Sequence, residues 1–390
     1  MVTCFVSDSY PPIQPYGGIG IYTQTAARAI SARGHEVHVV VGCLGENCDK
    51  MDGPIHVHYR TVRWLPVVGN ILPGLGESLL LAKVIRELHR EYHFDLVEFP
   101  NFEGLGLAFQ AFNSVPVVVR LHTSMVESVE VQHRRATFGE RFMMWAERQS
   151  ARWAQGVVTH STSHRDRLAS IYGLPEIYLI KHGIQLPGAR VQQISPLSVL
   201  TIGRLSERKG GATLLASIPR VYEQVPGVTF TIVGATDEEP VMRNFRDAYP
   251  SIPHASVVCR GFVSEAELDA LYEATAVYAS ASIYESFGLT FVEAMARGKP
   301  VVGCAISAMN EIIAHETTGL LVPPGAPESF ASAIVRLLRD APLRARLGHE
   351  GRRVALKEYN AERMGAEIEA WYRDVLRKGA RVTSRPAAIG

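Results

Sequence analysis

The sequence contains little that would place it in a membrane, in an oxidising compartment or on nucleic acid. No apolar run reaches the ~20 residues of a membrane span, and the first residues, MVTCFVSDSY, lack the basic region and apolar core of a signal peptide. Forty basic residues face 39 acidic ones, which leaves no electrostatic footprint for nucleic acid. We therefore expect a cytoplasmic protein with no nucleic-acid partner, with peripheral contact at the inner membrane face as an open alternative.

The sequence also offers few metal ligands in recognisable spacing. An odd number of cysteines favours reduced, intracellular thiols, and none of them has the paired spacing of a zinc site: Cys4, Cys43, Cys48, Cys259 and Cys304. There is no Asp-x-Asp pair that would present Mg²⁺ or Mn²⁺ to a diphosphate. The pair His56 and His58 is interpreted as a strand with surface histidines. We expect no metal site.

The chain is long enough for two domains, because single cores stop growing at roughly 250–300 residues. At its start, an apolar strand, the loop PPIQPYGGIG, a helix from Ile19 to about Arg33 and the strand EVHVVVG make one βαβ unit. Strand and helix patterns continue to alternate and fall into two successive series, each of which spans about half the chain. The sequence predicts an α/β fold of two Rossmann-like domains, whose parallel sheets face each other across a cleft.

The predicted organisation has five parts. Residues 1–185 form an N-terminal domain on the acceptor side, and 186–196, with two prolines and a glycine, form a linker. Residues 197–359 form the donor-side domain, 360–378 a helix that crosses the junction, and 379–390 a disordered tail. Ligands bind beyond the carboxyl ends of the strands in such sheets, so the candidate residues are sought there.

Four segments carry candidate residues. In ESFGLTFVEAMARGKPVV, a helix starting near Gly288 offers unpaired N–H groups to an anion, and Glu293 can accept from two ribose hydroxyls. In GRLSERKG, Arg204 and Lys209 flank a helix start and suit a diphosphate. Each assignment has a plainer alternative. Glu293 could be an ordinary helix glutamate, and Arg204 and Lys209 could be solvated basic residues of the surface.

The other two segments lie in the first half. YGGIG supplies Gly18 and Gly20 for close approach to a phosphate, although it lacks the G-x-G-x-x-G spacing of a dinucleotide dehydrogenase. His122 ends the strand VVVRLH and would face the crevice, with a structural role as the alternative.

The order of all these motifs resembles the family 4 retaining glycosyltransferases of the GT-B fold, from about Val2 to Tyr372. Glu285 and Glu293, with seven residues between them, are the most specific part.

The resemblance implies a role for each matching position. Glu293 would bind the donor ribose, while Arg204 and Lys209 would clamp the diphosphate, which Gly18 and Gly20 would approach from the first domain. The backbone at Val263 would meet the base and His122 the sugar. The transferring sugar and distal phosphate would be held by Glu285 and by the backbone of Phe287, Gly288 and Leu289.

The sequence departs from the family's usual pattern in four places. Thr123 stands where an Asp is frequent, His182-Gly183-Ile184-Gln185 where Asn-Gly-Val-Asp is frequent, and Ala235-Thr236 where a fuller glycine loop is frequent. Ser307-Ala308-Met309-Asn310 replaces a Gly-Gly segment. These changes put the donor-sugar contacts in question and leave the diphosphate clamp intact.

The implied reaction is metal-independent transfer of a hexose from a UDP-, GDP- or ADP-sugar to a small-molecule, glycan or glycolipid hydroxyl, with front-face retention. His122, Glu285, Arg204 and Lys209 are the expected catalytic residues. Two alternatives stay open: a sugar-nucleotide epimerase of the same fold, which would need no acceptor, and a non-catalytic subunit that binds sugar nucleotides.

One further segment, residues 133–153, reads as an amphipathic helix. Phe138, Phe142 and Trp145 share a face flanked by arginines, with Glu140 and Glu147 opposite. We expect this face to be a stripe directed at the core with snorkelling arginines. The alternative is a surface that lies on an anionic membrane.

Overall fold

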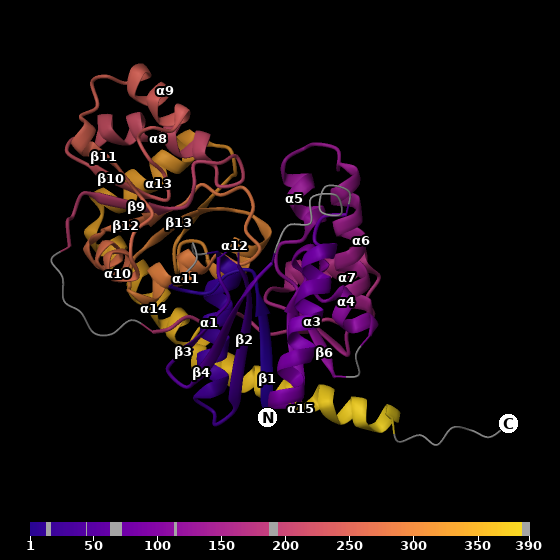
Figure 1. Cartoon of the computed structure of the whole chain (residues 1–390). Coiled ribbons are helices and arrows are strands. Elements are labelled where there is room, and N and C mark those ends of the chain that lie inside the picture. Colours follow the sequence, from indigo (N-terminus) through magenta and orange to yellow (C-terminus); the bar gives the residue numbers. More distant parts are fainter. Residues whose placement is uncertain (13–16, 44, 63–71, 113–114, 187–193, 384–390) are drawn as a thin grey trace. The chain divides into compact units, whose positions relative to one another are not determined.

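The computed structural model describes the chain except residues 13–16, 44, 63–71, 113–114, 187–193 and 384–390. The chain divides into two compact units (Figure 1). Unit 1 contains Met1–Gln185 and Ala361–Gly390, and unit 2 contains Leu186–Asn360. The final helix therefore returns to the unit that holds the first strand.

Unit 1 is built on an eight-stranded sheet with the order β3-β4-β2-β1-β5-β6-β7-β8. Neighbouring strands are parallel except β3 and β4, which are antiparallel. The apolar, β-branched runs that predicted buried strands form its centre. The strands are β1 (Val2–Ser7), β2 (Glu36–Cys43), β3 (Cys48–Asp52), β4 (Ile55–Thr61), β5 (Leu96–Pro100), β6 (Val117–Arg120), β7 (Gly156–Thr159) and β8 (Tyr178–Leu179).

Helices cover both faces of this sheet. Successive side chains of a strand point to opposite faces, and β1 accordingly contributes Cys4 to one core and Phe5 to the other. The first core includes residues of α3, α4 and α7, and the second includes residues of α1 and α15, which pack together (Figure 1). The described helices of unit 1 are α1 (Gly18–Ser31), α3 (Leu75–Tyr92), η1 (Phe102–Gly104), α4 (Leu107–Ala111), α5 (Met125–Val131), α6 (Phe138–Trp153), α7 (Thr162–Tyr172) and α15 (Ala361–Thr383).

Unit 2 has a fully parallel six-stranded sheet with the order β11-β10-β9-β12-β13-β14. Its strands are β9 (Ser198–Ile202), β10 (Thr229–Val233), β11 (Val257–Gly261), β12 (Val277–Ala279), β13 (Val301–Cys304) and β14 (Leu320–Val322). Its helices are α8 (Gly211–Gln224), α9 (Pro240–Ala248), η2 (His254–Ser256), α10 (Glu265–Ala274), α11 (Leu289–Ala296), α12 (Ser307–Ile312), α13 (Pro327–Arg339) and α14 (Ala341–Glu358). The prediction of two α/β domains with parallel sheets is confirmed.

Two local predictions differ from the structure, and a third lies mostly outside the described residues. The last helix runs to Thr383, five residues beyond its predicted end, because the helical pattern continues into the segment we predicted as tail. The prediction that His56 and His58 are both surface histidines is wrong for His58. This side chain is buried, and its Nε2 lies 3.0 Å from Nδ1 of His38 on the neighbouring strand β2. Asp49 of the neighbouring strand β3 lies opposite His58 with a carboxylate oxygen 2.8 Å from its ring, and the Tyr92 ring lies 5.9 Å away. Most of the predicted linker, 187–193, lies outside the described residues.

Helix α6 does not direct the predicted stripe at the core. Phe138 is 70% exposed and Trp145 is 47% exposed, whereas Glu147, expected on the opposite side, is buried. The buried face is formed by small and flexible residues that pack on η1 and α4: Met143, Ala146, Ser150 and Ala151. Among the described residues, no helix combines the length and the apolar character needed to cross a bilayer.

Candidate functional site

Two loops at the carboxyl edge of the unit 2 sheet are fastened to each other. One connects β9 to α8, and the other follows β12. Gly210 has φ +65°, and a β-carbon there would collide with the carbonyl oxygen of Ala281. The Ile283 N–H donates to the Arg208 carbonyl at 3.0 Å. This close approach, open only to glycine, fixes the GRLSERKG segment beside the ESFG segment.

An ion pair joins these two loops. The Lys209 Nζ lies 2.5 Å from Glu285 Oε1, and the Ser282 hydroxyl donates to the same oxygen at 2.8 Å. An Arg208 nitrogen lies 4.0 Å from Glu285 Oε2. Both partners of the pair are partly exposed, so a ligand can reach them. The structure thus brings together Lys209 and Glu285, which the sequence placed in separate roles.

The start of α11 follows directly. Gly288 caps the helix with φ +105°, and a β-carbon at Gly288 would collide with the end of the Met309 side chain. Phe287 is buried and Leu289 opens the helix. The first N–H groups of a helix have no partner within the helix and carry a partial positive charge. Lys209 and the first amides of α11 therefore lie on neighbouring loops at the same edge of the unit 2 sheet.

Glu293 lies on the second turn of α11. It accepts a hydrogen bond from the Tyr272 hydroxyl at 2.7 Å. Burial raises the pKa of the Glu293 carboxyl, against the lowering effects of that hydrogen bond and of Arg297. Tyr272, which sequence reasoning did not single out, thus orients the carboxylate and leaves its other oxygen for a ligand.

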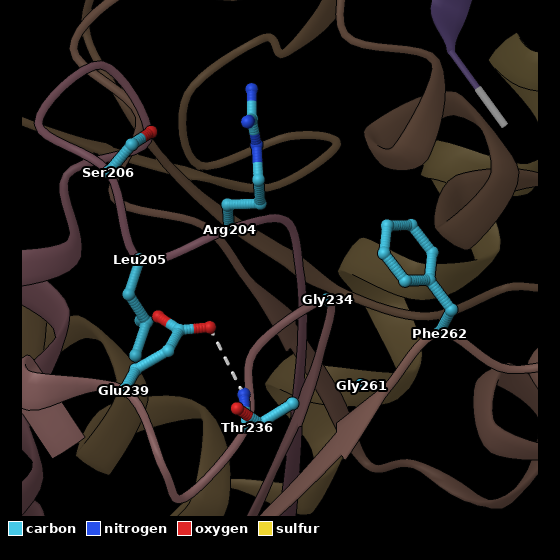
Figure 2. Close-up of a pocket in the computed structure, with 8 residues that line it drawn as sticks. All are labelled: Arg204, Leu205, Ser206, Gly234, Thr236, Glu239, Gly261 and Phe262. Atoms are coloured by element: carbon cyan, nitrogen blue, oxygen red, sulfur yellow. Dashed lines mark hydrogen bonds between the residues drawn. The ribbon is translucent and has the colours of Figure 1, made fainter. Parts of the chain in front are cut away.

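A pocket of about 350 Å³ lies at the ends of β9, β10 and β11 (Figure 2). Its backbone walls include Gly234, whose N–H donates to the Gly261 carbonyl at 2.6 Å. Glu239 accepts from the Thr236 N–H at 3.2 Å, and the Arg204 side chain extends away from that bond in Figure 2. Among the described residues Arg204 has no ion-pair partner, so its charge is available to a ligand.

Phe262 is the residue of this pocket that the sequence reasoning missed. It is 74% exposed, an unusual state for a phenylalanine, and it lines the pocket beside Gly261. The predicted residue Val263 is its immediate neighbour. The signal in the sequence was the aromatic residue in GFVSEAEL, directly after a strand.

In unit 1, His122 is buried just beyond the end of β6. Its backbone N–H donates to the Asn101 side chain at 2.7 Å, and the ring meets Tyr22 edge-on at 5.3 Å. Burial, with the nearby charge of Arg120, lowers the pKa of His122 to about 3. The imidazole is therefore neutral at physiological pH.

The two predicted glycines differ. Gly18 is the first residue of α1 and is exposed, with open space where a β-carbon would project. Gly20 is buried, and a β-carbon there would collide with Ser9. Packing of α1 against the loop after β1 therefore explains why position 20 requires glycine. Residues 13–16 of the same loop lie outside the described chain.

Comparison with known proteins agrees with this arrangement. The chain matches the family model described as Glycosyltransferase Family 4 over residues 16–186, and the model described as Glycosyl transferases group 1 over residues 196–340. It is 32% identical over 386 residues to a phosphatidyl-myo-inositol mannosyltransferase of Mycolicibacterium smegmatis, a match that covers 95% of this chain and 94% of the relative. It is 26% identical to a glycogen synthase of Mycobacterium tuberculosis, covering 86% of this chain and 85% of the relative.

Solved structures share the fold. A sucrose-phosphate synthase from Thermosynechococcus elongatus superposes with a TM-score of 0.77 at 21% identity, covering 97% of this chain and 99% of that one. The Anabaena protein HepE, solved in complex with UDP-glucose, gives a TM-score of 0.70 at 21% identity, covering 96% and 100%. The motif order, the two parallel-sheet units and these matches establish that the chain belongs to glycosyltransferase family 4 and has the GT-B fold.

Proposed function

We propose that this glycosyltransferase moves a hexose from a nucleoside diphosphate sugar to a hydroxyl acceptor, with retention of configuration and without a metal. The observation that carries the proposal is the Lys209–Glu285 pair, held at 2.5 Å between two loops beside the start of α11. An ammonium group has three donors, so Lys209 can keep Glu285 and still donate to a phosphate oxygen. The site can therefore neutralise a leaving diphosphate without rearranging.

The diphosphate lies against the positive groups of unit 2. Arg204, which lines the pocket, and Lys209 supply the charge, and the first amides of α11 at Leu289 add donors. Groups fixed in this way stabilise charge that develops on the departing oxygen, because they need no reorganisation during the reaction. Glu285 then accepts hydrogen bonds from the hydroxyls of the transferring sugar.

The nucleoside binds along the same edge. The two ribose hydroxyls donate to Glu293, which Tyr272 holds in place. The base enters the pocket at the ends of β9, β10 and β11, where the exposed ring of Phe262 offers a stacking face and the backbone around Val263 offers hydrogen bonds. Glu239 is the only carboxylate among the residues that line this described pocket, and it favours a base with N–H donors.

The reaction proceeds on one face of the sugar. The bond between the anomeric carbon and the phosphate oxygen breaks, and the acceptor oxygen bonds to the anomeric carbon from the same side. The departing phosphate oxygen takes the acceptor proton. Burial lowers the pKa of His122 and keeps the imidazole neutral, so toward a sugar it would act as a hydrogen-bonding group rather than as a cation.

Transfer by purified protein tests the proposal. UDP-, GDP- and ADP-sugars are first screened by thermal shift, since a ligand that binds the folded state raises the melting temperature. The best donor is then assayed with and without hydroxyl acceptors. A sugar product that forms only with acceptor supports the transferase. Conversion of the donor without acceptor would indicate the epimerase, and no turnover with any donor would indicate the non-catalytic subunit.

Two measurements address the finer claims. Product formed early in the reaction should carry the same anomeric configuration as the donor by NMR, and inversion would contradict the retaining mechanism. Turnover should survive prior treatment with EDTA. A loss that added Mg²⁺ or Mn²⁺ restores would contradict metal independence.

We further propose that α6 contacts an anionic membrane surface. The exposed rings of Phe138 and Trp145 are accompanied on this helix and the preceding turn by the exposed arginines Arg134 and Arg141. Aromatic residues among basic ones suit the interface of an anionic bilayer. Co-sedimentation should be stronger with phosphatidylglycerol-containing vesicles than with phosphatidylcholine vesicles, and it should fall when Phe138 and Trp145 are both changed to Ser. Equal recovery with the two vesicle types would remove this proposal.

A further inference from the structure

Three histidines follow three neighbouring strands of unit 1. His122 comes two residues after β6, His160 directly after β7, and His182 three residues after β8. These strands are adjacent and parallel, so their carboxyl ends lie at one edge of the sheet. The topology thus delivers one imidazole from each strand to the same place.

The three side chains are buried and converge. One nitrogen from each lies within 4.8 Å of those from the other two. The ring centroids of His160 and His182 are 4.5 Å apart, and those of His122 and His182 are 5.8 Å apart. Zinc holds imidazole nitrogens at roughly 2.0–2.1 Å in a tetrahedral arrangement, which places the nitrogens about 3.3 Å apart. Ligation therefore requires ring rotations that bring the most distant nitrogens up to about 1.5 Å closer and turn their lone pairs toward one point.

A fourth histidine lies beside the converging three. His164 stacks on His160 at 4.7 Å, and its Nδ1 lies 2.6 Å from the Thr159 hydroxyl, while its Nε2 lies 3.2 Å from a Glu127 oxygen. Both of its nitrogens therefore contact protein groups, and it is not one of the three that converge.

A buried positive charge near the cluster is already paired with a carboxylate. The nearby guanidinium of Arg120 is balanced by Glu98, whose carboxylate lies 2.9 Å from it and also accepts from the hydroxyls of Tyr22 and Tyr372. A cation held by the three imidazoles would therefore not face an unbalanced positive charge from Arg120.

We propose that His122, His160 and His182 form a binding site for one divalent transition-metal ion of the zinc class. Three imidazoles and no thiolate or carboxylate suit Zn²⁺, Co²⁺, Ni²⁺ or Cu²⁺ over Mg²⁺ and Ca²⁺, which prefer oxygen. Three protein ligands leave a fourth position for water or another oxygen ligand. All three ligands belong to unit 1, whereas the groups that hold the donor diphosphate belong to unit 2.

Metal titration of the full chain tests this site in the absence of donor and acceptor, so its result does not depend on the proposed transfer reaction. Protein stripped with EDTA and dialysed is titrated with Co²⁺, followed by the visible absorption bands of tetrahedral cobalt, and with Zn²⁺ by calorimetry. We expect one ion per chain and no comparable uptake of Mg²⁺. An absence of stoichiometric Co²⁺ and Zn²⁺ binding would overturn the proposal.

Variants assign the ligands. His182→Asn and His122→Asn should each weaken Zn²⁺ binding by at least about a hundredfold, since loss of an outer-shell partner already costs about 10–100-fold. His349→Ala, which removes an exposed histidine of unit 2, should bind as the unchanged protein does. Circular dichroism identifies any variant that fails to fold. If one of the two ligand variants fails to fold, the other ligand variant decides the test. Unaltered affinity in a folded ligand variant would place the ion elsewhere and contradict the assignment.

Discussion

The Arg120–Glu98 ion pair of unit 1 and the Lys209–Glu285 ion pair of unit 2 differ in almost every respect. In unit 1, Arg120 and Glu98 are 0% and 4% exposed, and two tyrosine hydroxyls complete the carboxylate's hydrogen bonds. In unit 2, Lys209 and Glu285 are 21% and 10% exposed and join two loops. The first pair is enclosed by protein, whereas the second keeps donors that can turn to a ligand. Burial therefore distinguishes a charge that maintains the fold from a charge that is available for binding.

The largest effect should come from breaking the enclosed pair. Arg120→Met leaves Glu98 buried without its cation, and removing one partner of a buried pair costs about 3–5 kcal/mol. We expect the free energy of unfolding, measured in urea, to fall by about that amount. Restoring balance with Arg120→Met and Glu98→Gln together should recover most of the loss. A change below about 1 kcal/mol in the single variant would mean that water reaches this pair.

The second largest effect concerns transfer rather than folding. Lys209→Ala removes a fixed donor to the departing phosphate, and such a loss costs about 2.7–4 kcal/mol of transition-state stabilisation, or about a hundredfold or more in kcat. The assay uses saturating donor. Arg243→Ala, which removes an exposed arginine from α9 outside the pocket, is the matched control and should keep its rate. Near-normal transfer by Lys209→Ala would remove Lys209 from the proposed clamp.

These two pairs also show how far the sequence could lead. Buried parallel strands are continuous apolar runs, so most strands of both sheets could be located from the sequence to within a few residues, and the loops that bear Lys209 and Glu285 followed from their ends. The contact between Lys209 and Glu285 could not be predicted from the sequence. It depends on the packing of Gly210 against Ala281, which is distant in the sequence. Local pattern gives the strand ends, and tertiary packing decides which of them meet.

The same limit explains the errors at α6 and His58. The spacing of apolar residues gives the apolar face of a helix, but it does not say whether anything covers that face. In α6 the covered face is the one with small residues and Glu147, so Phe138 and Trp145 stay exposed. His58 is enclosed by side chains from three other segments, Asp49, His38 and Tyr92, and the pattern of its own strand does not show these contacts. Phe262 was passed over because an exposed aromatic residue cannot be told from a buried one by sequence alone.

A smaller effect should follow from Phe262→Ala. Stacking of a base on an aromatic side chain contributes about 1–3 kcal/mol, so the affinity for the nucleoside diphosphate should fall about tenfold. Calorimetry with the free diphosphate of the preferred donor measures this directly. Phe262→Trp should retain affinity because it keeps a stacking face, and stability should change little because the ring is already exposed. If Phe262→Ala binds as tightly as the unchanged protein, the base lies elsewhere.

The smallest effect returns to the exposed pair and completes the comparison. Partly solvated ion pairs contribute about 0–1 kcal/mol to folding, because water already screens both charges. A double-mutant cycle of Lys209→Ala and Glu285→Gln, followed by urea unfolding, should therefore give a coupling energy of at most about 1 kcal/mol, well below the cost of breaking the Arg120–Glu98 pair. The same two substitutions should strongly reduce transfer. A coupling energy of several kcal/mol would instead mean that the Lys209–Glu285 pair holds the two loops together, and its contribution to catalysis would then be indirect.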